Sequence, residues 1–158
     1  MEKVEEEYQD GSIYYGEKEN GLRHGYGRFS YNDGGIYEGE WKYGTMDGYG
    51  KLYYPSGKLA YEGEWKQNTF NGNGKVFNES PSSRTVSYDY KNFDLLDDDW
   101  ERFEGKFVDD YKHGMGVLYL VNGERYMGSF KEDMISGEGQ FFTLDNNIIN
   151  GNWVENKL

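Results

Sequence analysis

A repeat of about 23 residues constrains this chain more than any other feature of its sequence. Tyr-Glu-Gly-Glu-Trp at residues 37–41 returns at residues 61–65, and weaker copies of this pattern occur elsewhere. The copies begin at Tyr14, Tyr37, Tyr61, Phe103, Tyr126 and, as a partial repeat, Ile149. Neighbouring copies lie 23 or 24 residues apart, and an insertion separates the third from the fourth. Such a period indicates a repeat protein, in which each repeat becomes stable by stacking on its neighbours.

Two further positions keep a fixed distance from the start of each copy. A Gly-x-Gly pair lies eleven residues after the start in all five complete copies. Seven residues after the start the residue is always Gly, Asn or Asp, the types that most readily adopt positive φ angles. These positions are Gly21, Gly44, Asn68, Asp110, Asp133 and Asn156. The pattern predicts a left-handed turn residue at the same place in every repeat.

Alternation within each repeat predicts a β-strand on either side of this turn. In residues 37–41 large rings alternate with polar residues around a central glycine, and residues 48–54 alternate again. A period of two places the rings on one face of a strand. Glycine in a strand lets a neighbouring ring lie over its bare backbone. We therefore predict an all-β fold: an elongated, single-layer, twisted antiparallel sheet of tandem β-hairpins, arranged like a solenoid.

The repeats divide the chain into a short lead-in and one repeat domain. Residues 1–13 are predicted to be an acidic N-terminal tail and lead-in strand, and residues 14–158 the repeat domain. The insertion spans about residues 79–100 and mixes acidic residues with Leu95, Leu96 and Trp100. It is either a loop whose apolar residues pack against the sheet or a docking loop for a specific partner. Its three consecutive Asp residues lack the spacing and turn glycine of an EF-hand, so we expect no calcium site.

Charge and composition exclude several classes of protein. Aromatic residues make up 18% of the 158 residues, which argues against disorder and lets ring surfaces supply the buried area. The net charge of −12 repels the phosphate backbone of nucleic acid and disfavours binding to anionic membranes. The chain has no cysteine, and its first residues lack the apolar core of a secretory signal. We expect a cytoplasmic protein that does not bind nucleic acid.

The sequence shows no arrangement typical of catalysis. His24 and His113 occupy the same turn position in different repeats, where a polar side chain can bond to turn backbone. With no cysteine and no third histidine, neither a zinc site nor a nucleophile–base pair is indicated. The carboxylates recur with the repeat, as on a solvated face. We expect no catalytic residue, no metal and no cofactor, and hence no enzyme.

The repeat resembles the MORN repeat (membrane occupation and recognition nexus). Tyr-x-Gly-x-Trp, a glycine and then His-Gly-x-Gly are typical of that family, and residues 14–27 and 37–50 match best. The resemblance omits only residues 1–10 and about 80–100, although the first repeat carries Lys18 where Trp41 and Trp65 stand later. It implies a stand-alone, non-enzymatic scaffold or adaptor, associated with the cytoskeleton in an assembly such as a ciliary or flagellar axoneme complex. The alternative implied by the family name is association with membranes or phospholipids.

The face that carries the rings is the first candidate for binding a partner. A one-layer sheet leaves some ring surface open, and contiguous apolar surface usually marks an interaction site. The predicted groove would receive a helix or an extended peptide and is lined by Tyr37, Trp41, Tyr61, Trp65, Phe103, Phe107, Tyr126 and Phe130. The alternative is that these rings form the core. Carbohydrate binding by the rings is a third interpretation, weakened because the repeat itself demands them.

The opposite face differs between the two halves of the chain. In the first half we expect an opposite-charge ladder of Glu17, Glu40 and Glu64 with Arg28, Lys51 and Lys75. In the second half the apolar residues form a second-face patch of Met115, Val117, Tyr119 and Met127. We expect this patch to be covered, either by the insertion folding back on it or by a protein partner. The strand edge left by the partial last repeat also predicts self-association or addition to a larger complex.

Overall fold

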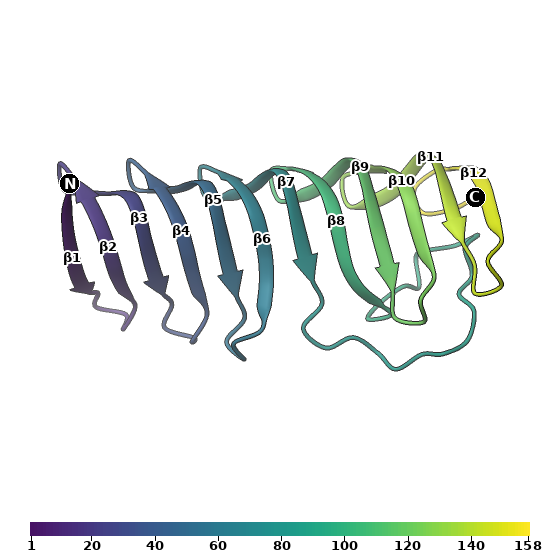
Figure 1. Cartoon of the computed structure of the whole chain (residues 1–158), viewed down its shortest axis with the longest axis horizontal. Helices are drawn as coiled ribbons and strands as arrows, with labels where there is room; N and C mark the ends of the chain where they lie inside the picture. Colours follow the sequence, from purple (N-terminus) through teal and green to yellow (C-terminus); the bar gives the residue numbers. More distant parts are fainter. The chain divides into compact units, whose positions relative to one another are not determined.

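The computed structural model describes residues 1–158, which form twelve β-strands and no helix (Figure 1). The first seven strands are β1 (Glu2–Glu7), β2 (Ile13–Glu19), β3 (Leu22–Ser30), β4 (Ile36–Lys42), β5 (Thr45–Tyr53), β6 (Leu59–Lys66) and β7 (Thr69–Phe77). The last five are β8 (Trp100–Val108), β9 (Tyr111–Leu120), β10 (Arg125–Lys131), β11 (Met134–Phe142) and β12 (Ile148–Trp153). Each complete repeat supplies one hairpin, and β1 is the predicted lead-in strand, paired with β2.

The chain forms two compact units, a first unit of residues 1–74 and a second unit of residues 75–158. The boundary falls inside β7, within the third repeat. In each unit the strands are hydrogen-bonded in the order of the sequence, as an open antiparallel sheet. The predicted all-β antiparallel sheet of tandem β-hairpins is therefore confirmed.

The tight turn of each hairpin follows the predicted register. The six predicted turn residues all have φ between 71° and 90°. The residue before each of them also lies in the left-handed region, with φ between 46° and 51°. These preceding residues are Asn20, Tyr43, Gln67, Asp109, Glu132 and Glu155. Two consecutive left-handed residues are typical of the type I′ turn, whose twist matches that of the flanking strands.

A β-bulge next to this turn shifts the register of the hairpins. In the β4–β5 hairpin Gly39 lies opposite Gly50, but Trp41 lies opposite Met46, so the second strand carries the extra residues. Equivalent shifts occur in the β2–β3, β8–β9 and β10–β11 hairpins. Because a bulge bends a strand and leaves residues unpaired, the residue between the glycine and the second ring has no partner within its own hairpin, although it pairs with the preceding strand, as Glu40 does with Tyr26.

The bulge also corrects the predicted charge ladder. The carboxylate of Glu40 accepts a hydrogen bond from the backbone N–H of Tyr49, and Glu17 and Glu64 accept the equivalent bonds at 2.7 and 2.5 Å. These three carboxylates therefore bond to the bulged backbone and do not form the ladder. The strand register instead places Lys51 opposite both Glu38 and Glu62.

Each hairpin is built around a ring that lies on bare glycine backbone, as the sequence predicts. A Cβ added to Gly50 would lie 2.3 Å from the hydroxyl oxygen of Tyr37, which is closer than any real Cβ contact. The same ring-on-glycine contact recurs in every complete repeat. Its pairs are Tyr14–Gly27, Tyr37–Gly50, Tyr61–Gly74, Phe103–Gly116 and Tyr126–Gly139. Only glycine at these positions leaves room for the ring.

The rings of successive repeats then interlock edge to face. The ring centre of Tyr37 lies 5.3 Å from that of Trp41 and 5.0 Å from that of Trp65, at interplanar angles of 87° and 82°. Tyr126 lies between Phe130 and Trp153 in the same way. Aromatic pairs in this geometry contribute about 0.5–1.5 kcal/mol beyond their buried area. The core of each unit is thus a continuous row of perpendicular rings.

Replacing Gly50 with Ala is expected to lower the free energy of unfolding by about 3 kcal/mol, because the added methyl group overlaps the Tyr37 ring. Denaturant titration measures this loss. Gly57→Ala is the matched control, since its Cβ meets nothing within 4 Å and only its φ of 91° is unfavourable, a cost of about 1 kcal/mol. Equal losses in the two variants would contradict the ring-on-glycine account.

The buried tyrosines predict loss of stability at alkaline pH. Burial raises the pKa of Tyr14 and of Tyr126 to about 12, and that of Tyr37 further, from about 10 in an unfolded chain. Because the folded state favours the protonated form, this contribution is complete below pH ~10 and is lost as the pH rises through about 12. We expect the free energy of unfolding to fall across this range in denaturant titrations. A constant free energy there would show that these hydroxyls titrate normally.

Candidate functional site

The eight rings of the predicted groove form the core and do not line an open surface. Each is at most 5% exposed, from Tyr37 at 0% to Trp41 and Trp65 at 5%. The hydroxyl of Tyr37 donates to the backbone oxygen of Glu40 at 2.7 Å, and Trp41 Nε1 donates to that of Gly27 at 3.1 Å. The predicted groove lining is therefore wrong, because the rings are already enclosed by glycine backbone, by each other and by a second row of side chains.

This second row lies above the core on the ring face of the sheet, the face that carries the eight rings. Its positions are nine and fifteen residues after the start of each repeat. In the first unit they are Arg23, Phe29, Met46, Leu52 and Phe70, which we call the open ring face. All five are half-buried. These five positions follow the repeat pattern, but the binding groove predicted from the sequence named only the larger rings.

The equivalent positions of the second unit are more deeply buried. Leu118, Ile135 and Phe141 are 3%, 2% and 0% exposed. Lys112 remains half-buried there, as does Val76, which lies fifteen residues after the start of the third repeat. The same repeat positions thus differ in exposure between the two units, and the cause is the insertion.

The insertion covers the ring face of the second unit. Figure 1 shows the teal segment between β7 and β8 running along the second unit as far as β12 before it returns. Phe93 is 4% exposed, and its ring centre lies 5.8 Å from that of Phe141 and 6.3 Å from that of Trp153. Trp153 Nε1 donates to the backbone oxygen of Tyr90 at 2.8 Å. The insertion therefore acts as an internal ligand of this face.

A buried carboxylate holds the insertion in place. Glu124 is 2% exposed, and it accepts hydrogen bonds from the backbone N–H of Tyr88 and from Asn122 Nδ2, both at 2.7 Å. Its second oxygen accepts from the backbone N–H of Leu144 at 3.2 Å. Sequence reasoning missed Glu124, because a single acidic residue in a turn carries no periodic signal and its partner Tyr88 is distant in the sequence.

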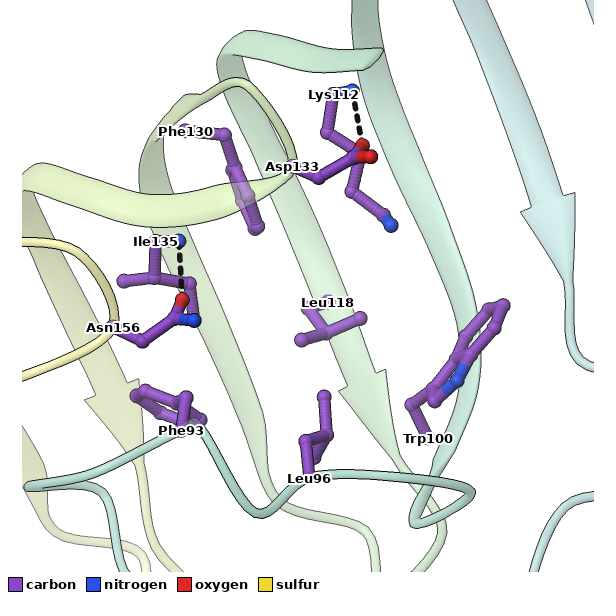
Figure 2. A pocket seen from close by; sticks show the side chains of 9 residues that line it. All are labelled: Phe93, Leu96, Trp100, Lys112, Leu118, Phe130, Asp133, Ile135 and Asn156. Atoms are coloured by element: carbon purple, nitrogen blue, oxygen red, sulfur yellow. Dashed lines mark hydrogen bonds between the residues drawn. The ribbon is translucent and has the colours of Figure 1, made fainter. Parts of the chain in front are cut away.

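A small cavity remains between the insertion and the sheet. Its volume is about 120 Å³, and it is lined by Phe93, Leu96, Trp100, Lys112, Leu118, Phe130, Asp133, Ile135 and Asn156 (Figure 2). The ammonium of Lys112 lies 5.6 Å from the ring centre of Trp100, and burial lowers the pKa of this lysine. Asp133 accepts a hydrogen bond from the backbone N–H of Lys112 at 2.8 Å. The cavity thus encloses a cation on aromatic surface.

The three insertion residues singled out in the sequence have different surroundings. Leu96 and Trp100 line the cavity, so packing against the insertion's own sheet is the correct interpretation for them. Leu95 is 78% exposed and does not pack there. A docking role for Leu95 remains a prediction.

The second-face patch is not covered by the insertion, which lies on the ring face. Met115 is 59% exposed and Met127 is 39% exposed, whereas Val117 and Tyr119 are half-buried. The guanidinium of Arg102 lies 3.7 Å from the ring centre of Tyr119 and shields part of it. Cover by the insertion is therefore wrong for this patch, and cover by a partner remains a prediction.

The two histidines lie close to the hairpin turns, as the third residues of β3 and β9. His24 Nδ1 accepts a hydrogen bond from the backbone N–H of Tyr43 at 3.2 Å, and its Nε2 lies 3.3 Å from the carboxylate of Glu19. This is the turn contact that the sequence predicts. No cluster of three or more His, Cys, Asp or Glu side chains that could hold a metal ion is present. The structure contains no helix that could span a membrane.

Comparison with protein families agrees with the hairpin array. The family model described as MORN repeat matches residues 14–36, 37–58, 61–76, 103–125 and 126–143. The chain belongs to the MORN repeat family. The five matches begin at the five complete repeats found by spacing. The MORN repeat is a non-enzymatic repeat module, which agrees with the interpretation of the chain as repeats that serve interaction.

The proteins to which this MORN repeat protein is similar match about half of it. Alsin from Rattus norvegicus and Alsin from Mus musculus are each 32% identical to it over 87 residues. Alsin from Homo sapiens is 32% identical over 86 residues. These alignments cover 51% of this chain, which spans only 5% of the length of each relative.

Removing the Glu124 carboxylate is expected to loosen the insertion. Glu124→Ala leaves the buried N–H of Tyr88 without its acceptor, at a cost of about 1–3 kcal/mol. Hydrogen–deuterium exchange with mass spectrometry should then show faster exchange in residues 86–96, with slow exchange retained in the strands. Glu138→Ala, at an exposed position on β11, is the matched control. Unchanged exchange in the insertion of Glu124→Ala would contradict the assigned role.

Proposed function

We propose that this MORN repeat protein is a non-enzymatic adaptor that binds a segment of a partner protein on the open ring face. One observation carries the proposal. The insertion buries this row of repeat positions in the second unit, whereas the same row in the first unit is only half-buried. Residues of one repeat family thus form a protein-binding face that is occupied in one unit and unoccupied in the other.

The chemistry of the open ring face suits a protein segment. Phe29, Met46, Leu52 and Phe70 provide contiguous apolar surface, and such surface on a protein usually marks an interaction site. The insertion shows that this kind of face accepts both rings and backbone, because Phe93 packs on the rings while Trp153 donates to the backbone of Tyr90. A segment that presents aromatic or aliphatic side chains therefore fits the first unit, where the indole N–H groups of Trp41 and Trp65 already donate to backbone oxygens.

The wider setting that we propose is the cytoskeleton. A chain of MORN repeats suits a component of a cytoplasmic, cytoskeleton-associated assembly, such as a ciliary or flagellar axoneme complex. The net charge of −12 supports a protein partner over an anionic membrane surface. Phospholipid binding is the alternative that the experiment must separate.

Site-specific crosslinking tests the proposal. A photo-crosslinking residue at Leu52, on the open ring face, should capture a protein partner from cytoplasmic extract, whereas one at Tyr49, which is 51% exposed on the other face, should not. Met46→Lys should abolish capture at position 52. Lysine at this position is expected to leave the fold intact, because the fourth repeat carries Lys112 there. Trp41 and Trp65 are unsuitable targets because they are buried.

Two results would contradict the assignment of the face. One is capture at Tyr49 alone, and the other is capture at Leu52 that persists in the Met46→Lys variant. Co-sedimentation with phosphatidylserine-containing vesicles is the parallel measurement. Binding to such vesicles without protein capture would favour the membrane alternative and overturn the adaptor proposal.

A further inference from the structure

Arg23 is the one charged residue of the open ring face, and it has no anionic partner. Its guanidinium carbon lies 4.8 Å from the ring centre of Phe29 and 5.2 Å from those of Tyr8 and Trp41. Tyr14 lies 5.5 Å away on the same measure. Its Nε is buried without a hydrogen-bond partner, and no carboxylate forms an ion pair with it. The structure therefore holds a partly desolvated cation among four rings.

This arrangement prepares Arg23 to bind a carboxylate. The four surrounding rings restrict the guanidinium, so less side-chain freedom remains to be lost when a ligand binds. Arginine and carboxylate form paired, charge-assisted hydrogen bonds that are stronger where water is excluded. Because Arg23 is only half-buried, an incoming group can reach it. An apolar ligand would leave the buried Nε unpaired, whereas an acidic ligand would supply its missing counter-charge.

The second unit shows what covers a cation at the equivalent position. Lys112 stands nine residues after the start of its repeat, as Arg23 does. The segment that covers it, residues 88–99, combines Tyr88, Phe93 and Leu96 with five aspartates. One of these, Asp94, forms an ion pair with Lys157 at 3.3 Å. The chain's own ligand for a ring face thus places aromatic and aliphatic side chains on the sheet, within a segment that is acidic in sequence.

We propose that the open ring face selects an acidic, aromatic segment of a partner protein, and that Arg23 pairs with a carboxylate of that segment. Met46 and Phe70 continue the same row in the next two repeats and receive the apolar side chains. The inference rests on the proposed function, because it assigns the chemistry of the segment that docks there. The overall charge of −12 repels acidic peptides in general, so Arg23 supplies the selectivity at this position.

A peptide with the sequence of residues 86–100 is a suitable probe, because it carries the chemistry of the internal ligand. Its binding to the full-length protein is measured by fluorescence anisotropy at physiological salt, beside a peptide in which every Asp is replaced by Asn. Arg23→Met is the main variant, since the second repeat carries Met46 at the same position. Arg23→Lys retains the charge, and Met46→Lys reports whether the peptide occupies the open ring face. Thermal unfolding of each variant checks that the fold is intact.

The expected result is a double-mutant cycle with strong coupling. Arg23→Met should weaken binding of the acidic peptide at least tenfold, Arg23→Lys should weaken it less, and the Asn peptide should be insensitive to either change. Met46→Lys should weaken both peptides.

Three results would overturn the inference. Equal weakening of both peptides by Arg23→Met would exclude the carboxylate pairing, while sensitivity to Met46→Lys would leave the adaptor proposal standing. Absence of binding to the wild-type protein would reject the acidic, aromatic chemistry, and crosslinking at Leu52 would still decide the adaptor function separately. Dimerisation of the wild-type protein that Arg23→Met abolishes would assign the face to a second copy of this chain.

Discussion

The contact between an aromatic ring and the bare backbone of a facing glycine is the interaction on which the rest of the structure depends. Tyr37 occupies the space that a side chain at position 50 would fill, so the ring and Gly50 specify one another. The ring then presents its edge to tryptophans of its own and the next repeat. Because each ring serves two repeats, the core grows along each unit. The largest aromatic residues are buried in this core, so that the smaller side chains of the ring face are the ones that stay partly exposed in the first unit.

Periodic and local features of the fold could be predicted from the sequence. The spacing of the glycines located the hairpins, and the Gly, Asn or Asp positions located a turn residue, because backbone sterics alone restrict both. The first residue of each turn was not predicted, because Tyr and Glu, found at Tyr43 and Glu132, are residue types that rarely adopt positive φ. Because of the bulge, Glu38 lies opposite Lys51 and Glu40 accepts a bond from backbone. An alternation pattern does not reveal such a bulge.

The candidate site was harder to predict, because it depends on contacts between distant residues. Nothing in the sequence shows that the bond from Tyr88 to Glu124 brings the insertion onto the ring face. In the structure the insertion covers one row of repeat positions in the second unit. The same row of the first unit has no such cover. Arg23 then stands out by comparison with Met46 and Lys112 at the same repeat position.

The central claim is that a partner covers the first unit on the face that the insertion covers in the second. Oxidative footprinting of the methionines tests it most directly, because Met46 lies on the open ring face while Met115 and Met127 lie on the opposite face. A bound partner is expected to slow oxidation of Met46 and to leave oxidation of Met115 and Met127 unchanged. Protection of Met115 and Met127 with unchanged oxidation of Met46 would contradict it.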